Sequence, residues 1–274
     1  TNGKGDYSVI SEKSARKKME DNQEYQASQD VDRAGIDPDI AYPSRGFKRI
    51  DGKFVYVGKE IDNLATSPVR EISEILVIPK TIGGNTINYI TKDAFYEEKS
   101  IKKVVLHEKI KSIEHNAFSG CQNLSLIENV PEWITIGKDS FKNTQIYTSD
   151  TLHYLNHVLI KAEPSVSGKI VVKEGTHVIS DNAFENCKEI TQVILPQSIR
   201  KIGACAFQNC INLKSIQFPA QMDFIGENAF YGCISLKEIQ LPNNLSKIKE
   251  KAFYNCTSLQ NVVIQNTITT IENY

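Results

Sequence analysis

Hydrophobic residues recur along most of this chain with a period of 23 residues. The period is marked by the phenylalanines Phe95, Phe118, Phe141, Phe184, Phe207, Phe230 and Phe253. A small residue directly precedes each of them: Ala94, Ala117, Ser140, Ala183, Ala206, Ala229 and Ala252. Isoleucines lie five residues ahead of the phenylalanines, and this series continues one period further: Ile90, Ile113, Ile136, Ile179, Ile202, Ile225, Ile248 and Ile271. Because a fixed period of about 20 to 50 residues indicates units that stack along one axis, we predict a solenoid.

Each period contains two segments with different hydrophobic patterns. In the segment L-x-x-I-x-L, inward residues alternate, as at Ile216 and Phe218, which predicts a short strand with one face on the core. A proline follows this segment in the clearest copies and, lacking an N–H, ends the strand: Pro196, Pro219 and Pro242. In the segment I-x-x-x-A-F-x-x-C, apolar residues recur at spacings of about 3 to 5, which predicts one turn of α- or 3₁₀-helix. We therefore predict an α/β repeat solenoid, a right-handed coil with a parallel β-sheet on one face and short helical turns on the other.

The energetics of one period explain why the copies must come in series. Each copy offers roughly eight apolar residues, worth about 2 kcal/mol apiece when buried. Ordering the backbone costs about 1 to 2 kcal/mol per residue over the whole copy. A single copy would not fold, so stability belongs to the array. The small residue before each phenylalanine fits this picture, because we expect it to press against the next coil.

The periodic region extends over residues 90–274, with one interruption. Phe141 and Phe184 are 43 residues apart, which is one period plus 20 residues. We predict an inserted coil at about residues 147–168 that stacks in register without a phenylalanine-bearing turn. The segments YLNHVLIK and KIVVK on either side of the connection AEPSVSG are predicted to be strands.

The segments outside the array have different compositions. Residues 47–89 are rich in strand-forming residues and are predicted to cap the N-terminal end of the core. Residues 1–46 are polar, and we predict a linker or a weakly ordered N-terminal segment, with a weak helix as the alternative. The chain begins at Thr1 without a methionine, so we expect its natural N-terminus to have been removed. Ile271 opens another copy shortly before Tyr274, so we expect the array to continue in the parent protein.

The repeated phrase resembles the BspA-like leucine-rich-repeat family, also called type 5 leucine-rich repeats. The best copies read IGACAFQNCINLKSIQFPAQMDF, IGENAFYGCISLKEIQLPNNLSK and IKEKAFYNCTSLQNVVIQNTITT. The first three copies depart from the pattern, with no cysteine near Glu98 and Thr144 and a one-residue shift around Ile127. The resemblance implies a right-handed leucine-rich-repeat coil in a secreted or surface-exposed protein of host-associated bacteria or protozoan parasites, acting in adhesion. It transfers no catalytic residue.

The overall charge argues against two classes of partner. With 32 basic and 33 acidic residues, the net charge is −1 at pH 7, so the sequence offers neither the basic footprint of a nucleic-acid binder nor a polybasic membrane patch. No apolar run approaches the roughly 18 residues of a membrane-spanning helix, so we expect no membrane insertion by this chain.

Six cysteines and five histidines are the candidates for metal binding, disulfides or catalysis. Five of the cysteines occupy one motif position, where we expect buried free thiols acting as small hydrophobic residues: Cys121, Cys187, Cys210, Cys233 and Cys256. Cys205 lies beside the motif and is the thiol most exposed to reaction. His153 and His157 have the spacing of a helical metal pair, but they fall in a predicted strand, so we expect surface histidines. Trp133 is expected in the core, with an exposed aromatic contact as the alternative.

We find no catalytic motif and expect no enzyme, no cofactor and no metal site. The outward positions of the parallel strands are the predicted binding surface. The middle outward positions are Val105, Ile194, Gln217, Gln240 and Val263, and the flanking positions are Lys103, Gln192, Ser215, Glu238 and Asn261. We expect an extracellular or cell-surface module that binds a protein partner, such as a host protein, through this face. The alternatives are a carbohydrate-binding module and a structural spacer that carries another domain.

Overall fold

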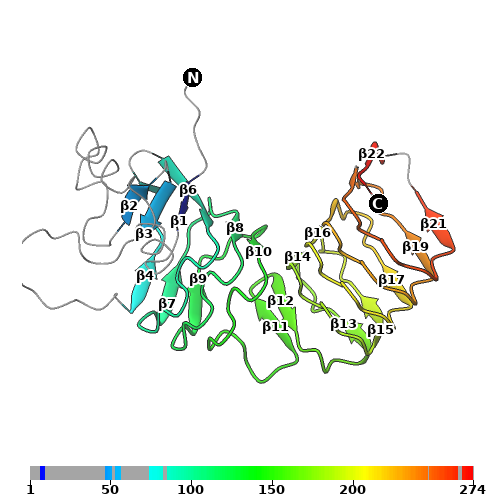
Figure 1. Ribbon diagram of the computed structural model, residues 1–274, viewed down its shortest axis with the longest axis horizontal. Coiled ribbons are helices and arrows are strands. Elements are labelled where there is room, and N and C mark those ends of the chain that lie inside the picture. The colour runs from blue at the N-terminus through cyan, green and yellow to red at the C-terminus, as the bar shows by residue number, and fades with distance from the viewer. Residues whose placement is uncertain are drawn as a thin grey trace, which may run out of the picture. The chain divides into compact units, whose positions relative to one another are not determined.

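The computed structural model describes residues 7–9, 47–50, 53–56, 74–82, 85–245, 247–264 and 267–273. The chain divides into two compact units, Thr1–Tyr147 and Thr148–Tyr274. In each unit, successive coils place short strands in two separate rows, as the ribbon shows (Figure 1).

The first unit contains two parallel sheets and one hairpin. One sheet is formed by β4 (Ile75–Val77), β7 (Lys103–Val105) and β9 (Leu126–Glu128). The other is formed by β1 (Tyr7–Val9), β6 (Asn85–Ile90), β8 (Ser112–Ile113) and β10 (Thr135–Ile136), with β5 (Thr81–Ile82) antiparallel to β6. The antiparallel hairpin consists of β2 (Phe47–Ile50) and β3 (Lys53–Tyr56).

The second unit repeats the same two-row arrangement. Its first row consists of the sheet β13 (Gly168–Val171), β15 (Ile190–Ile194) and β17 (Ser215–Gln217), and of the pair β19 (Glu238–Gln240) and β21 (Asn261–Val263). Its second row begins with β11 (Leu152–Leu155), β12 (Val158–Ala162), β14 (Val178–Ile179), β16 (Lys201–Ile202) and β18 (Phe224–Ile225). The pair β20 (Lys247–Ile248) and β22 (Thr270–Ile271) completes the second row.

Strand register confirms the stacking of like coils. In β15 and β17, Val193 lies opposite Ile216, and in β16 and β18, Ile202 lies opposite Ile225. Both pairs are one period apart, so equivalent residues lie directly above one another along the coil axis. The strand face of the fold is therefore the predicted parallel sheet.

The predicted helical turns are wrong, because none of the described residues forms a helix. The isoleucine that opens I-x-x-x-A-F lies instead in the second row of short strands, as Ile202 does in β16. The segment around each phenylalanine is a run of turns in which the residues two before and two after it are left-handed: Asn182 has φ 58° and Asn186 has φ 62°. An α-helix cannot continue through such residues.

Alternate backbone N–H groups in these turns donate to the next coil instead of within their own. Phe184 N donates to Ala206 O at 2.7 Å, and Asn182 N and Asn186 N donate to Ala204 O and Gln208 O. The same three bonds recur in the following coils. The turn side is therefore held by a backbone ladder between coils, much as the strand side is.

A column of phenylalanine rings fills the core of each unit. The rings of Phe184 and Phe207 stack with centroids 4.8 Å apart and planes 8° from parallel, and Phe95 stacks on Phe118 at 5.1 Å. Such stacked pairs contribute about 0.5 to 1.5 kcal/mol beyond their burial. The small residues before the rings are buried, as expected: Ala94, Ala117, Ser140, Ala183, Ala206, Ala229 and Ala252.

Gly226 follows the isoleucine that begins the motif I-x-x-x-A-F, and the close approach of neighbouring coils explains why this residue is glycine. A Cβ on Gly226 would lie 2.5 Å from the backbone N of Ala204 and 2.6 Å from the backbone C of Gly203 in the preceding coil. Backbone atoms cannot move aside as a flexible side chain can. A methyl group at this position would therefore push the coils apart.

The coil between Phe141 and Phe184 contains no phenylalanine and stacks on the coil that follows it. Its strand β12 pairs in parallel with β14, Val158 opposite Val178, and β13 pairs with β15. Ala162 takes the place of the ring residue, since its N–H donates to Ala183 O at 2.7 Å. The prediction of one strand over YLNHVLIK is wrong, because the chain turns back at Asn156, which has φ 51°, and forms the antiparallel hairpin β11–β12.

Within the N-terminal segment 1–46, the structure describes only Tyr7–Val9, a strand that pairs in parallel with β6. The rest of the predicted linker lies outside the described residues. The strands β2 to β5 and all but the last residue of β6 fall within residues 47–89, the predicted cap, and β4 and β6 pair with β7 and β8 of the following coil.

Replacing Cys205 with Asn should stabilise the second unit. Cys205 holds a left-handed conformation, with φ 55°, at a turn position where the coil before it has Asn182. Asparagine adopts this conformation at lower cost than cysteine, and relief of such strain is worth about 1 kcal/mol. We expect the midpoint of thermal unfolding to rise by roughly 3 °C. Cys205→Ala removes the same thiol without the asparagine preference, so an equal rise in that variant would contradict the explanation.

Candidate functional site: the two strand faces

The strand face of the first unit exposes aliphatic residues among charged ones. In β4, β7 and β9, the middle residue of each strand is buried and the two flanking residues point outward. Register places Ile75 beside Lys103 and Leu126, and Val77 beside Val105 and Glu128. Ile75, Val77 and Leu126 are exposed to solvent.

Ion pairs line the same sheet. Lys103 Nζ lies 2.7 Å from Glu128 Oε1 across neighbouring strands, and Lys102 pairs with Glu74. These pairs are largely solvated, and such pairs contribute about 0 to 1 kcal/mol each to stability. Their charges balance, so this face has no dominant sign of charge and little power to steer a charged partner.

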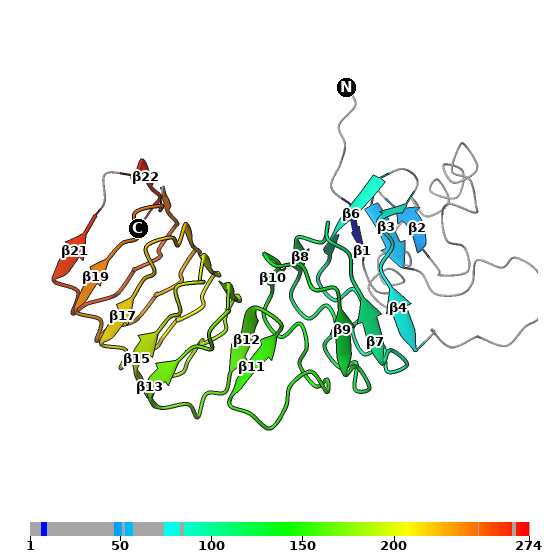
Figure 2. The same ribbon diagram turned by 180° about the vertical axis from the view of Figure 1, so that it is seen from behind.

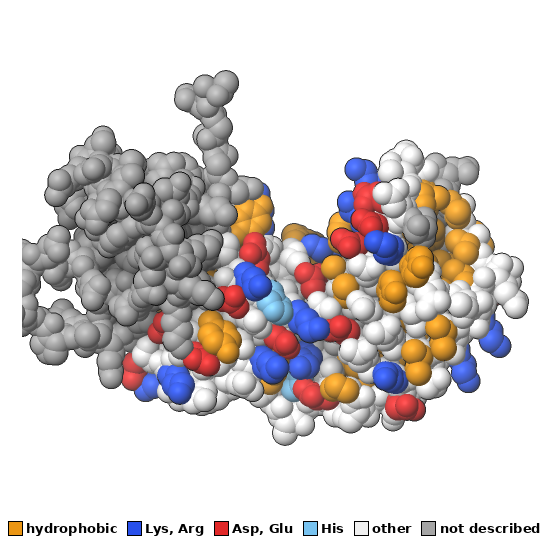
Figure 3. Space-filling view, viewed as in Figure 1, with side chains coloured by type: hydrophobic (Ala, Val, Ile, Leu, Met, Phe, Trp, Pro, Cys, Tyr) orange, Lys and Arg blue, Asp and Glu red, His pale blue; other side chains and the backbone are white. Residues whose placement is uncertain are grey.

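The strand face of the second unit carries one outward row of aliphatic and amide groups. The row runs across β13, β15, β17, β19 and β21 and contains Val171, Ile194, Gln217, Gln240 and Val263. A second, more polar row flanks it with Lys169, Gln192, Ser215, Glu238 and Asn261. Over β13 to β21 the visible surface of this unit is mainly hydrophobic and uncharged, whereas charged side chains gather near β11 and β12 and beside β22 (Figure 3).

All ten positions predicted from the repeat point outward from their strands, but they do not form one described surface. Lys103 and Val105 belong to the first unit, and the other eight belong to the second. Sequence reasoning missed six further outward positions: Ile75, Val77, Leu126, Glu128, Lys169 and Val171. They fall in the first coil, the shifted copy and the inserted coil, where only the alternation of apolar residues could have identified them.

Trp133 does not pack in the core, and that prediction is wrong, since its side chain is exposed. Its position two residues after Pro131 corresponds to the polar residues Ser198, Gln221 and Asn244 in later copies. This is a turn between the two rows of strands, where the Trp133 side chain is 50% exposed.

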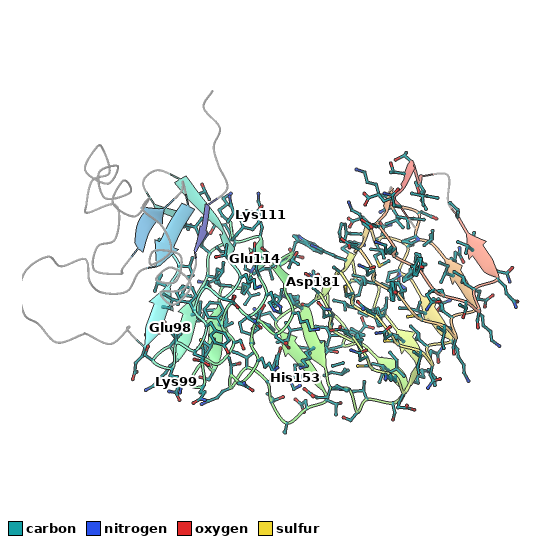
Figure 4. The ribbon with its side chains drawn as sticks, viewed as in Figure 1. Glu98, Lys99, Lys111, Glu114, His153 and Asp181 are labelled. Carbon is teal, nitrogen blue, oxygen red and sulfur yellow. The ribbon has the colours of Figure 1, made fainter. Side chains whose placement is uncertain are left out.

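The prediction of surface histidines is wrong for His153 and right for His157. His153 lies in β11 and is buried, with Nε2 2.9 Å from Glu163 Oε1 (Figure 4). His157 is exposed at the hairpin turn, where its ring stacks on that of His177 with centroids 4.7 Å apart. Within the described ranges, no group of three or more His, Cys, Asp or Glu side chains could hold a metal ion.

The five motif cysteines are buried free thiols, as predicted. Each thiol points at a backbone carbonyl of the preceding coil, as Cys233 Sγ does toward Phe207 O at 3.1 Å. Burial raises the pKa of Cys121, Cys187 and Cys256 to about 12, so these thiols are protonated at neutral pH. They are poor nucleophiles for that reason. Cys205 differs in being partly exposed, and its reactivity stays a prediction.

Comparison with known proteins identifies the repeat. The sequence model described as BspA type leucine rich repeat region matches six copies over residues 78–158 and 168–274, which is more than half of the chain. The chain belongs to the BspA-type leucine-rich-repeat family. The match begins at residue 78, ahead of the array predicted from the phenylalanine period. No curated protein matches the chain.

Solved structures of bacterial leucine-rich-repeat proteins are similar to this chain. A leucine rich cell surface protein of Faecalibacterium prausnitzii is 26% identical with a TM-score of 0.42, over 70% of this chain and 60% of that one. A leucine rich repeat protein of T. pallidum is 22% identical with a TM-score of 0.35, over 73% of each chain. The pneumococcal vaccine antigen PcpA is 16% identical with a TM-score of 0.42, over 84% of this chain and 77% of that one.

The described part of the chain contains no helix with the length and hydropathy that are needed to cross a bilayer.

We expect His107 to make the stability of the first unit sensitive to acid. It is buried, and desolvation lowers its pKa below the usual value, so the folded state holds the neutral ring. As pH falls through the unfolded-state pKa of about 6.5, the unfolded chain binds a proton that the folded state does not, so stability falls. His107 occupies the place of Pro196, Pro219 and Pro242. We expect His107→Pro to lose less stability than the parent between pH 7.5 and pH 5, measured by urea unfolding.

We expect a proline at position 107 to be tolerated, because the backbone hydrogen bond at this site is accepted by the carbonyl oxygen of residue 107. Ile110 N donates to His107 O just as Ile199 N donates to Pro196 O. His107→Gln provides a control that removes the titrating ring without the proline constraint. Equal acid sensitivity in the parent and both variants would show that other groups cause the loss.

Proposed function

We propose that this chain is a non-catalytic protein-interaction module of the adhesion type, which binds a protein partner through its strand faces. We also propose that it acts outside the cell or at the cell surface. The observation that carries the proposal is the outward row Val171, Ile194, Gln217, Gln240 and Val263 of the second unit, in which exposed aliphatic residues lie among uncharged amides. A single exposed aliphatic residue is ordinary, whereas a row of them across neighbouring strands is typical of binding surfaces.

The composition of these rows suits a protein partner. In the second unit, Val171, Ile194 and Val263 offer apolar contact, while Gln217 and Gln240 can both donate and accept hydrogen bonds. Protein interfaces combine an apolar centre with hydrogen-bonding groups at the rim. The balance of charges means that binding would depend weakly on salt, in contrast with electrostatically steered association.

A glycan partner has less support. Carbohydrate sites commonly offer an aromatic ring as a flat platform, and the outward positions of the described strands on these faces contain no Phe, Tyr or Trp. The stacked pair Tyr231 and Tyr254 follows the core phenylalanines by one residue and lies on the turn side. The strand face therefore favours protein over sugar.

A binding assay on an array of immobilised extracellular-matrix proteins tests the proposal. The test variant combines Ile194→Lys with Gln217→Arg, which places two charges in the centre of the outward row of the second unit. Burying an unpaired charge costs several kcal/mol, so we expect affinity for any bound partner to fall by more than tenfold. Surface plasmon resonance measures the change.

The matched control is Ile234→Lys. Ile234 is 39% exposed and Ile194 is 37% exposed, but Ile234 lies on the turn side, outside the strands. We expect this variant to bind as the parent does. Leu126→Lys tests the first unit in the same way. Binding that survives both strand-face variants would exclude the strand faces as the site, and failure to bind any protein on the array would count against the proposed role.

A further inference from the structure

Two tyrosines lie next to each other on the turn side of the second unit. Tyr231 follows Phe230 in the segment between β18 and β19, and Tyr254 follows Phe253 in the segment between β20 and β21 of the next coil (Figure 2). The two rings stack with their centroids 5.3 Å apart and their planes 19° from parallel. Because both residues occupy the same position of the repeat, one coil step separates them.

The fold does not require an aromatic residue at this position. Equivalent residues in other coils are small, charged or amide-bearing: Ser119, Lys142, Glu185 and Gln208. The position also faces solvent: Tyr231 is partly exposed although a coil lies on each side of it, and Tyr254 is exposed. Core packing therefore does not explain why tyrosine occurs in two consecutive coils.

Backbone hydrogen bonds hold the two tyrosines at this separation. On one side of Tyr231, Phe230 N donates to Ala252 O at 2.8 Å, and on the other side, Gly232 N donates to Tyr254 O at 2.9 Å. The core ring of Phe230 also stacks on its equivalent in the next coil at 5.3 Å. The backbone segments that carry the two tyrosine rings therefore cannot separate without the loss of these contacts.

Two phenols held in contact at the surface are placed for oxidative coupling. A one-electron oxidant takes one electron and the phenolic proton from each ring, which gives two phenoxyl radicals. The radicals join through ring carbons that are ortho to the oxygens, so that one C–C bond forms. The hydrogens on those two carbons then move to the oxygens, which restores both phenols. Because the rings are already held together, this step is effectively unimolecular and is favoured over coupling between chains.

We propose that Tyr231 and Tyr254 form a modification site, at which a peroxidase with hydrogen peroxide as the oxidant joins the two rings into dityrosine. Each tyrosine gives up one electron and one proton, and hydrogen peroxide takes them up and leaves as two molecules of water. The product is a covalent link between consecutive coils of the second unit. This modification requires no partner at the strand faces, so it can fail independently of the proposed binding function.

Treatment of the purified full chain with a haem peroxidase and hydrogen peroxide tests the proposal. We expect the fluorescence of dityrosine to appear while the chain remains a monomer of 30.8 kDa on a denaturing gel. Trypsin cleaves after Lys214, Lys237 and Lys251, so mass spectrometry of the monomer band should find peptides 215–237 and 252–274 joined, with the loss of two hydrogen atoms. The absence of this linked pair, or links only between chains, would overturn the proposal.

The variant Tyr254→Phe keeps a ring at this position but removes its hydroxyl. The second phenoxyl radical cannot form without that hydroxyl, so we expect the linked pair and most of the fluorescence to disappear. Peptide 252–274 also contains Tyr274, and a link that persists in this variant would assign the coupling to Tyr274 and overturn the proposal. Tyr96→Phe is the matched control, because Tyr96 occupies the same repeat position but is followed one coil later by Ser119. We expect this variant to form the link as the parent does.

Thermal unfolding provides a second readout of the link. Tyr231 and Tyr254 are 23 residues apart in the sequence. A link between them restricts the unfolded chain as a disulfide does, whereas in the folded chain the two rings are already stacked. We expect the midpoint of thermal unfolding of the second unit to rise by roughly 5 °C after oxidation, and to stay unchanged in oxidised Tyr254→Phe. A linked chain with a midpoint no higher than that of the untreated chain would contradict a link made within the folded stack.

Discussion

The close approach of successive coils is the constraint on which the rest of this structure depends. Rings such as Phe207 and Phe230 stack at 5.1 Å, and the backbone of one turn donates directly to the carbonyls of the next. At this separation, only a small residue fits before the ring and no side chain fits at Gly226. The constraint explains why the same residue types return every 23 positions, since each coil must reproduce the shape of its neighbour.

The same constraint decides the conformation of the turns. In an α-helix, the N–H groups of each turn would donate to carbonyl oxygens of the same coil. Here, alternate N–H groups donate to carbonyl oxygens of the following coil. This requires left-handed residues two positions before and two after each phenylalanine. Eleven of those fourteen residues are Asn, Asp or Gly, the types that adopt this conformation at least cost. The Asn, Asp and Gly residues therefore indicated left-handed turns in the sequence, but the prediction from apolar spacing alone was a helical turn.

The close approach of the coils restricts the residues on the inward face of the strands and leaves those on the outward face free to vary. Inward residues are fixed by the neighbouring coils, so their identity is narrow and repeated. Outward residues do not fill the core between coils, and they vary from Val to Gln to Lys between coils. This variation leaves the strand faces free to carry a binding specificity that the fold does not dictate.

By itself, the sequence determined the period, the stacked coils, the parallel strand face, the buried cysteines and the direction in which ten candidate residues point. These features depend on local spacing, and one register applies to every coil. Only the tertiary structure decided that His153 is buried and that Trp133 is exposed. Each of these outcomes depends on which segment lies alongside, and the same residue type in the same pattern is buried or exposed according to whether a neighbouring coil covers it.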